Sequence, residues 1–312
     1  MKIKLGSFSK IFLVTFIFTL LLNCKSIPFI KQSPQRSIPE YKPYETLLEV
    51  IGDFQLHLND DIYRFPIPKD ITGQNLFKAT ILRIESYRAL YPEKFKDIIA
   101  FTKALAYEKL RQYKEAIKYY EETVSYQSEL KDIAQEKLEI VREFDNVVNA
   151  EGKKDTLNDY IQAMEDKDRE LGKLTEKYKT TPYEFLALIE KEQNSADYFQ
   201  FLKLNRYYIV NGLEKSFEQI KKLIEENKES KNVYKHQLKL ADYYFELAKE
   251  YVLFNNPEET TFNYDEFFKF IKSAKNIYDS IAYTDGIPEK LEARGKAMAI
   301  EAYDREIREL YR

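Results

Sequence analysis

Residues suited to nucleophilic, acid–base or metal chemistry are scarce in this chain. Its 312 residues include one Cys and two His, at positions 57 and 236. His57 precedes Asp60 and Asp61 at a spacing compatible with metal binding, whereas lysines flank His236 on a predicted helix. Isolated histidines among charged residues usually face solvent, so we expect both rings to be exposed and both positions to tolerate substitution.

The sequence lacks the motifs of phosphate loops, serine nucleophiles, zinc proteases and calcium loops. A single Cys excludes an intrachain disulfide and a Cys-rich metal centre. The 52 Asp and Glu residues leave a glycosidase-like carboxylate pair as an alternative, but the acidic runs at 165–170 and 225–229 have the spacing of solvated helix faces. We therefore predict no catalytic residue, no metal and no cofactor, in a protein that is not an enzyme.

The only cysteine, Cys24, ends an N-terminal segment unlike the rest of the chain. Lys2, Lys4 and Lys10 flank or precede the apolar run IFLVTFIFTLLL at residues 11–22, and Leu21 stands three residues before Cys24. The run is short for a transmembrane helix, which needs about 20 residues, and has the length of a secretory signal.

These features resemble a bacterial lipoprotein signal peptide with its lipobox. The resemblance implies a signal peptide over residues 1–23 and acylation of Cys24, with palmitate-type chains, as the first mature residue. Two or more acyl chains hold a protein stably on a membrane. The alternatives are an ordinary signal peptide with an incidental cysteine and an uncleaved anchor.

Residues 24–43 are predicted to form a tether, because prolines at 28, 34, 39 and 43 oppose helix and favour extended polyproline II. Removal of residues 1–23 takes away three Lys and no acidic residue, so the net charge moves from −3 to −6. A mildly acidic mature chain offers no basic stripe, and we predict no nucleic-acid partner.

Residues 44–312 are predicted to form an all-α domain. Eight Gly and ten Pro are too few for an all-β protein, and apolar residues recur at helical spacing. Short breaks separate the predicted helices, which cover residues 44–58, 76–91, 95–110, 114–126, 130–148, 156–178, 182–193, 196–210, 213–227, 233–254, 264–283 and 288–311.

One stretch combines small and aromatic residues in a helical-hairpin pattern. In residues 104–120, ALAYEKLRQYKEAIKYY, the small residues Ala104 and Ala116 allow two helices to approach, and Tyr107 and Tyr120 fill the space beside them. The stretch resembles a tetratricopeptide (TPR) repeat, with the clearest copy over residues 98–128. Weaker copies cover about residues 198–228 and 240–274.

The TPR resemblance implies a right-handed α-solenoid of helical hairpins whose first helices line a concave groove. Exposed aromatic side chains there would anchor a peptide. The predicted groove residues are Phe101, Leu105 and Glu108 in the clear repeat and Tyr198, Phe201, Asn205 and Tyr208 in a weaker one. The alternative is that these side chains pack between neighbouring repeats.

Residues 87–92, YRALYP, which run into the clear repeat, further resemble outer-membrane-assembly-type TPR lipoproteins. The combined resemblance implies a lipid-anchored interaction or scaffold protein of the bacterial cell envelope, at the outer membrane or periplasm. Its partners would be other envelope proteins or peptides, and the membrane through the lipid. Two alternatives stay open, a carbohydrate- or peptidoglycan-handling α-superhelical protein and a surface-exposed adhesin.

Overall fold

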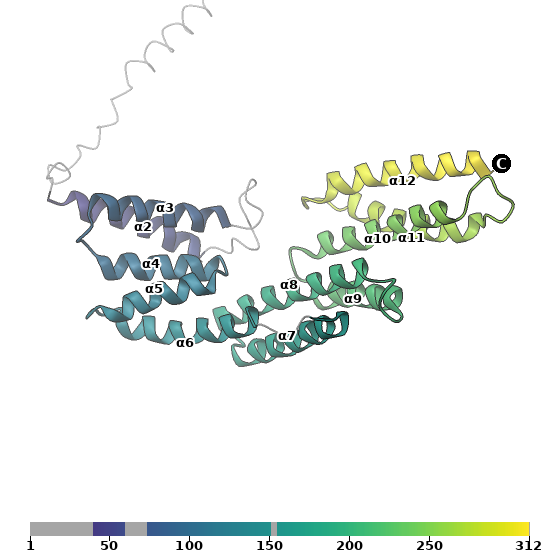
Figure 1. Cartoon of the computed structure of the whole chain (residues 1–312). Coiled ribbons are helices and arrows are strands. Elements are labelled where there is room, and N and C mark those ends of the chain that lie inside the picture. Colours follow the sequence, from purple (N-terminus) through teal and green to yellow (C-terminus); the bar gives the residue numbers. More distant parts are fainter. Residues whose placement is uncertain (1–39, 60–73, 151–154, 312) are drawn as a thin grey trace, which may run out of the picture.

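The computed structural model describes residues 40–59, 74–150 and 155–311, and all regular secondary structure within them is α-helical (Figure 1). Predictions for the signal peptide, Cys24 and nearly all of the tether concern residues outside these ranges. The helices are α2 (Lys42–Asn59), α3 (Gln74–Leu90), α4 (Lys96–Lys109), α5 (Tyr113–Ser125), α6 (Lys131–Val148), α7 (Leu157–Lys177), α8 (Pro182–Leu204), α9 (Gly212–Glu226), α10 (Val233–Phe254), α11 (Tyr264–Ala282) and α12 (Lys290–Tyr311).

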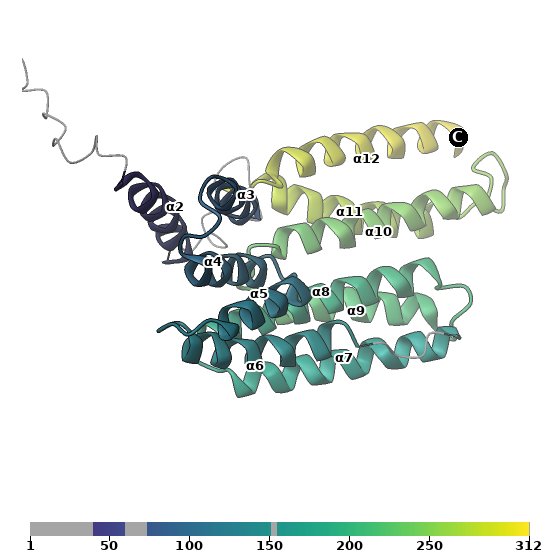
Figure 2. The same cartoon turned by 60° about the vertical axis from the view of Figure 1, so that its left-hand side comes forward.

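The helices are laid out in chain order. Every pair of helices with an extensive contact is consecutive in the sequence, from α2 with α3 to α11 with α12. Figures 1 and 2 show the result as a curved row of helices that begins with α2 and ends with α12. Such a row forms when each helix buries an apolar stripe against the helices before and after it.

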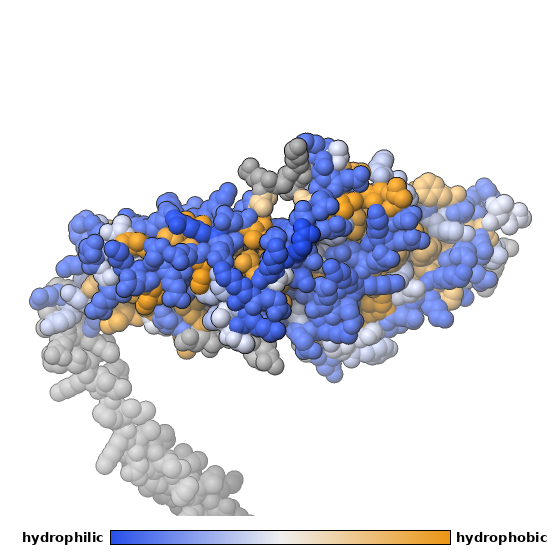
Figure 3. Space-filling view, turned by 90° about the horizontal axis from the view of Figure 1, so that it is seen from below, coloured by the Kyte–Doolittle hydropathy of each residue, from blue (hydrophilic) through white to orange (hydrophobic). Residues whose placement is uncertain are grey.

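The apolar core is divided along this row. The largest cluster of buried side chains runs from Phe54 on α2 to Ala187 on α8. A second cluster joins α10, α11 and α12, and smaller ones join α8 to α10 and α2 to α4. Apolar residues also reach the surface among the hydrophilic ones in both halves of the molecule (Figure 3).

Short polar residues determine where several helices start. Thr156 accepts a hydrogen bond from the backbone N–H of Asp159, whose carboxylate accepts one in return, which is a capping box at the start of α7. Thr181 caps α8 directly before Pro182, and Asn263 caps α11. Proline is suited to the first helical turn because its missing N–H would have no intrahelical acceptor there.

Three predicted boundaries are wrong. The helices predicted at 182–193 and 196–210 join into one continuous helix, α8, and that helix ends at Leu204, so residues 205–210 belong to the α8–α9 connection. The polar pair between the two predicted helices bonds to neighbouring helices: Asn194 Nδ2 donates to the Met164 carbonyl at 3.0 Å, and Gln219 Nε2 donates to Ser195 Oγ at 2.7 Å. In addition, α2 begins at Lys42, inside the predicted tether.

No helix among the described residues has the length and apolar character needed to cross a membrane.

Candidate interaction surface

The residues predicted to pack the clear repeat lie between α4 and α5. Ala104, Ala116 and Tyr120 are fully buried in the largest core cluster. Tyr107 is half-buried, and its ring stacks on that of Tyr119 with centroids 5.4 Å apart and planes 2° from parallel. The two alanines leave room for the helix axes to approach, and the tyrosines fill the space beside them.

The predicted groove residues of the clear repeat are largely core. Leu105 is 8% exposed and Glu108 is 2% exposed, so neither is accessible to a partner. Tyr120 donates a hydrogen bond to the Glu108 carboxylate at 2.6 Å, so the buried carboxylate has a partner within the repeat. Phe101 is half-buried, edge-on to Tyr120 at 6.0 Å. For this repeat, packing between helices replaces the predicted groove.

The groove residues predicted in the weaker repeat differ in how exposed they are. Tyr198 donates to Glu165 at 3.0 Å, Phe201 stacks on Tyr160 at 4.0 Å, and Asn205 Nδ2 donates to the Phe201 carbonyl at 2.9 Å. These three side chains are half-buried. Tyr208 differs, with 81% of its surface exposed. It is the one predicted groove residue that is fully available for binding.

Tyr208 belongs to a larger exposed apolar surface, which we call the turn patch. Its members are exposed large side chains at the end of α8, in the α8–α9 connection and in the last turn of α10: Leu204, Tyr207, Tyr208, Val210, Leu253 and Phe254. Tyr207 donates to Glu250 of α10 at 2.5 Å, and Leu253 and Phe254 lie one helical turn beyond Glu250. Of these residues only Tyr208 was predicted to bind a partner, although the run Tyr-Tyr-Ile-Val at 207–210 is an apolar signal in the sequence.

The turn that carries the patch is held firmly. The buried guanidinium of Arg206 forms an ion pair with Glu250 and donates to the Lys203 carbonyl at 2.7 Å. A Cβ at Gly212 would lie 2.3 Å from the Arg206 carbonyl oxygen, so only glycine fits where α9 begins. Asn211, just before it, adopts a left-handed conformation with φ 55°. These contacts fix the backbone of the turn, and the hydrogen bond to Glu250 fixes the ring of Tyr207.

The prediction that His236 faces solvent is wrong. The residue is 4% exposed, and its Nε2 lies 2.7 Å from Glu192 Oε1. Ser230 Oγ donates to the same carboxylate at 2.8 Å. Burial opposes ionisation of Glu192, but hydrogen bonds from His236 and Ser230 outweigh it, so the pKa of Glu192 lies below its ordinary value. The side chain of His57 lies outside what the structure describes.

Buried carboxylates elsewhere are satisfied by hydroxyl and guanidinium groups. Glu190 accepts from Tyr113 at 2.7 Å and lies 3.4 Å from Arg111. Neither Glu108 nor Glu190 lines the groove between α11 and α12 described below. Among the described residues, no group of three or more His, Cys, Asp or Glu is arranged to hold a metal ion.

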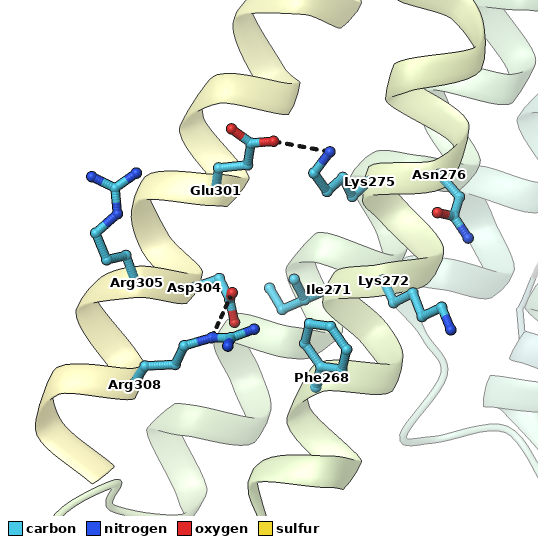
Figure 4. A pocket seen from close by; sticks show the side chains of 9 residues that line it. All are labelled: Phe268, Ile271, Lys272, Lys275, Asn276, Glu301, Asp304, Arg305 and Arg308. Atoms are coloured by element: carbon cyan, nitrogen blue, oxygen red, sulfur yellow. Dashed lines mark hydrogen bonds and ion pairs between the residues drawn. The ribbon is translucent and has the colours of Figure 1, made fainter. Parts of the chain in front are cut away.

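A groove runs between α11 and α12 at the C-terminal end of the row (Figure 4). It encloses about 450 Å³ and is lined by charged and amide side chains over an apolar floor. None of these residues was predicted to have a role, because lysine and arginine on a helix surface are indistinguishable from solvated residues until the facing helix is known.

Comparison with models of protein families gives no match for this chain, and comparison with curated proteins gives none either.

Proposed function

We propose that this chain is a lipid-anchored lipoprotein of the bacterial cell envelope whose helical domain is a TPR-like, right-handed α-solenoid. The domain acts as a protein–protein interaction or scaffold module. The observation that carries the proposal is the row of consecutive helices with an exposed aromatic patch at the α8–α9 turn.

The anchor is supported by the sequence. The sole cysteine stands directly after a basic segment and an apolar run, three residues after Leu21. Each buried methylene of an acyl chain contributes about 0.8 kcal/mol, so two or three chains suffice for stable anchoring. The proline-rich residues that follow give the domain reach from the lipid.

The interaction role is supported by the turn patch. Soluble monomers seldom expose a contiguous group of large apolar side chains without a partner. Tyr208 combines a large contact area with a hydroxyl that can bond at an interface, Tyr207 adds ring area, and tyrosines are enriched among the residues that dominate binding energy. The patch fits an apolar segment of another envelope protein or peptide.

Affinity purification from detergent-solubilised membranes, followed by mass spectrometry, tests the role. We expect a defined set of envelope proteins with the natural chain and its loss with Tyr208→Ala. Tyr283→Ala is the matched control, since Tyr283 is an exposed tyrosine at the end of α11. If the captured envelope proteins are unaffected by Tyr208→Ala, or are reduced equally by Tyr208→Ala and Tyr283→Ala, the proposal is contradicted.

A further inference from the structure

The groove between α11 and α12 combines a recessed apolar floor with charged sides. Ile271 is buried and Phe268 half-buried at its base, and the charged side chains come from both helices (Figure 4). An apolar floor between charged rims offers two kinds of contact to one ligand, area for an apolar group and ion pairs for charged groups on either side.

The two carboxylates that line the groove are already neutralised. Glu301 pairs with Lys275 at 2.9 Å, and Asp304 accepts from Arg308 Nε at 3.0 Å. The second oxygen of Asp304 accepts a hydrogen bond from Tyr264 at 2.5 Å. These acidic groups therefore have their partners within the protein, and the groove has no unmatched negative charge from them.

Two cations on the rims stay available. Lys272 on α11 and Arg305 on α12 are exposed, and neither has an ion pair or hydrogen bond within the part of the chain that the structure describes. In Figure 4 they extend outward from opposite sides of the groove. The unmatched charge of the groove is thus positive, in a mature chain whose net charge is −6 once residues 1–23 and their three Lys are removed.

We propose that the α11–α12 groove binds an acidic peptide segment of a partner protein. An apolar side chain of the peptide lies on Phe268 and Ile271, and acidic side chains on either side pair with Lys272 and Arg305. The exposed amide of Asn276 lines the same groove and can bond the peptide backbone. The proposal deepens the proposed interaction function, on which it rests, by assigning a partner chemistry to a second surface.

The mixture of charges favours a peptide over an anionic membrane surface. A flat layer of anionic headgroups would approach Glu301 and Asp304 as well as the cations, and a recessed floor is not reached by a flat surface. A peptide can place an apolar residue between two acidic ones, which matches the order of cation, floor and cation across the groove.

Fluorescence anisotropy tests the proposal with a short fluorescein-labelled peptide of alternating Leu and Glu. The full chain, purified in detergent, is titrated at low salt and at about 0.5 M NaCl, where screening acts within a few ångströms. We expect saturable binding that weakens with salt and is absent for the same peptide with Gln in place of Glu. Lys272→Glu with Arg305→Glu weakens binding at least about tenfold, which corresponds to 1.4 kcal/mol.

The matched control is Lys78→Glu with Lys114→Glu, which makes the same charge change at exposed positions of α3 and α5. We expect it to change affinity less than about twofold, with unchanged melting temperature for both double variants. Equal weakening by the two double variants, or no binding of the Leu-Glu peptide, overturns the proposal. Displacement of the peptide by phosphatidylglycerol added to the micelles also overturns it and reassigns the groove to lipid headgroups.

Failure of the groove proposal in the peptide titration can be told apart from failure of the proposed function in the affinity purification. If the groove variants leave peptide binding intact or the peptide does not bind, partner capture that depends on Tyr208 can still be observed in the affinity purification. Conversely, loss of every captured partner leaves the peptide titration unaffected, because the titration requires no cellular protein.

Discussion

The Tyr113 hydroxyl on α5 donates a 2.7 Å hydrogen bond to the buried carboxylate of Glu190 on α8, across 77 residues of chain. Arg111, in the α4–α5 turn, lies 3.4 Å from the same carboxylate. These contacts connect helices that are not consecutive, in a row otherwise held mainly by contacts between neighbours. The polar contacts of Glu190 therefore hold α8 against the α4–α5 hairpin.

Tyr113→Phe tests this connection. It removes the donor and leaves a buried carboxylate with Arg111 alone, and loss of one partner of a buried charged group costs about 1–3 kcal/mol. We expect that decrease in the free energy of unfolding, measured by urea titration. Tyr283→Phe, at an exposed position, should change it by less than about 0.5 kcal/mol. Equal changes in unfolding free energy for Tyr113→Phe and Tyr283→Phe would show that the Tyr113 hydroxyl does not stabilise the fold.

Ala116 tests the close approach of α4 and α5. Ala116→Phe places a ring where no side-chain volume is free and should cost about 1–3 kcal/mol or more. Ala116→Gly should cost about 1 kcal/mol through helix propensity. Thermal melts compare these variants with the control Ala79→Phe, which adds the same ring at an exposed position of α3. A melting temperature for Ala116→Phe equal to that of the natural chain would contradict the packing.

The His236–Glu192 pair predicts a stability that depends on pH. The pKa of Glu192 is lower in the folded chain than its ordinary value of 4.5, so the folded state favours the carboxylate. The ionised Glu192 carboxylate therefore contributes its full share of the unfolding free energy above about pH 4.5. That contribution is lost as the pH falls through the pKa of Glu192 in the folded chain. Glu192→Gln should lower the unfolding free energy more at pH 7 than at acidic pH, measured by urea titration at each pH.

Glu214→Gln, at an exposed position of α9, is the control and should give no such pH dependence. His236→Ala should cost about 1–3 kcal/mol, because it removes a hydrogen bond from a buried carboxylate. A loss of less than about 1 kcal/mol, the value expected for an exposed histidine, would contradict the buried pair.

Helical periodicity predicted much of the fold, because an amphipathic helix places its apolar residues on one face in the sequence itself. The helix predicted at 233–254 has the same bounds as α10. The break predicted at 194–195 was wrong because Asn and Ser are typical of helix ends, and only the facing helices, with Met164 and Gln219, satisfy them within α8.

The environment of His236 could not be predicted either, because its partners are distant in the sequence. Its neighbours in the sequence are lysines, whereas its neighbours in space, Glu192 and Ser230, come from α8 and the segment before α10. Glu108 was likewise placed on a groove because of its position in the TPR-like pattern, and its partner Tyr120 becomes evident only when α4 and α5 pack. Polar residues buried by tertiary contacts carry no local signal in a single sequence.

Phe101 and Tyr208 were predicted to share one role, and the structure separates them. Phe101→Ala should cost about 1–3 kcal/mol, below the 3–5 kcal/mol typical of fully buried Phe, because the ring is half-buried against Tyr120. Tyr208→Ala should change stability by less than about 0.5 kcal/mol and reduce partner capture. Thermal melts beside pull-downs measure both; equal destabilisation by the two changes would make Tyr208 a core residue.

The proposed membrane anchor depends on one thiol, so fatty-acid labelling at Cys24 is the decisive test of the lipoprotein proposal. Cells that express the full chain are fed an alkyne analogue of palmitate, and the purified protein is examined for label beside Cys24→Ala. We predict label on the natural chain, and none on Cys24→Ala, which should also retain residues 1–23 as an unprocessed precursor. Label retained by Cys24→Ala, or absent from the natural chain, would show that Cys24 is not the site of a lipid anchor.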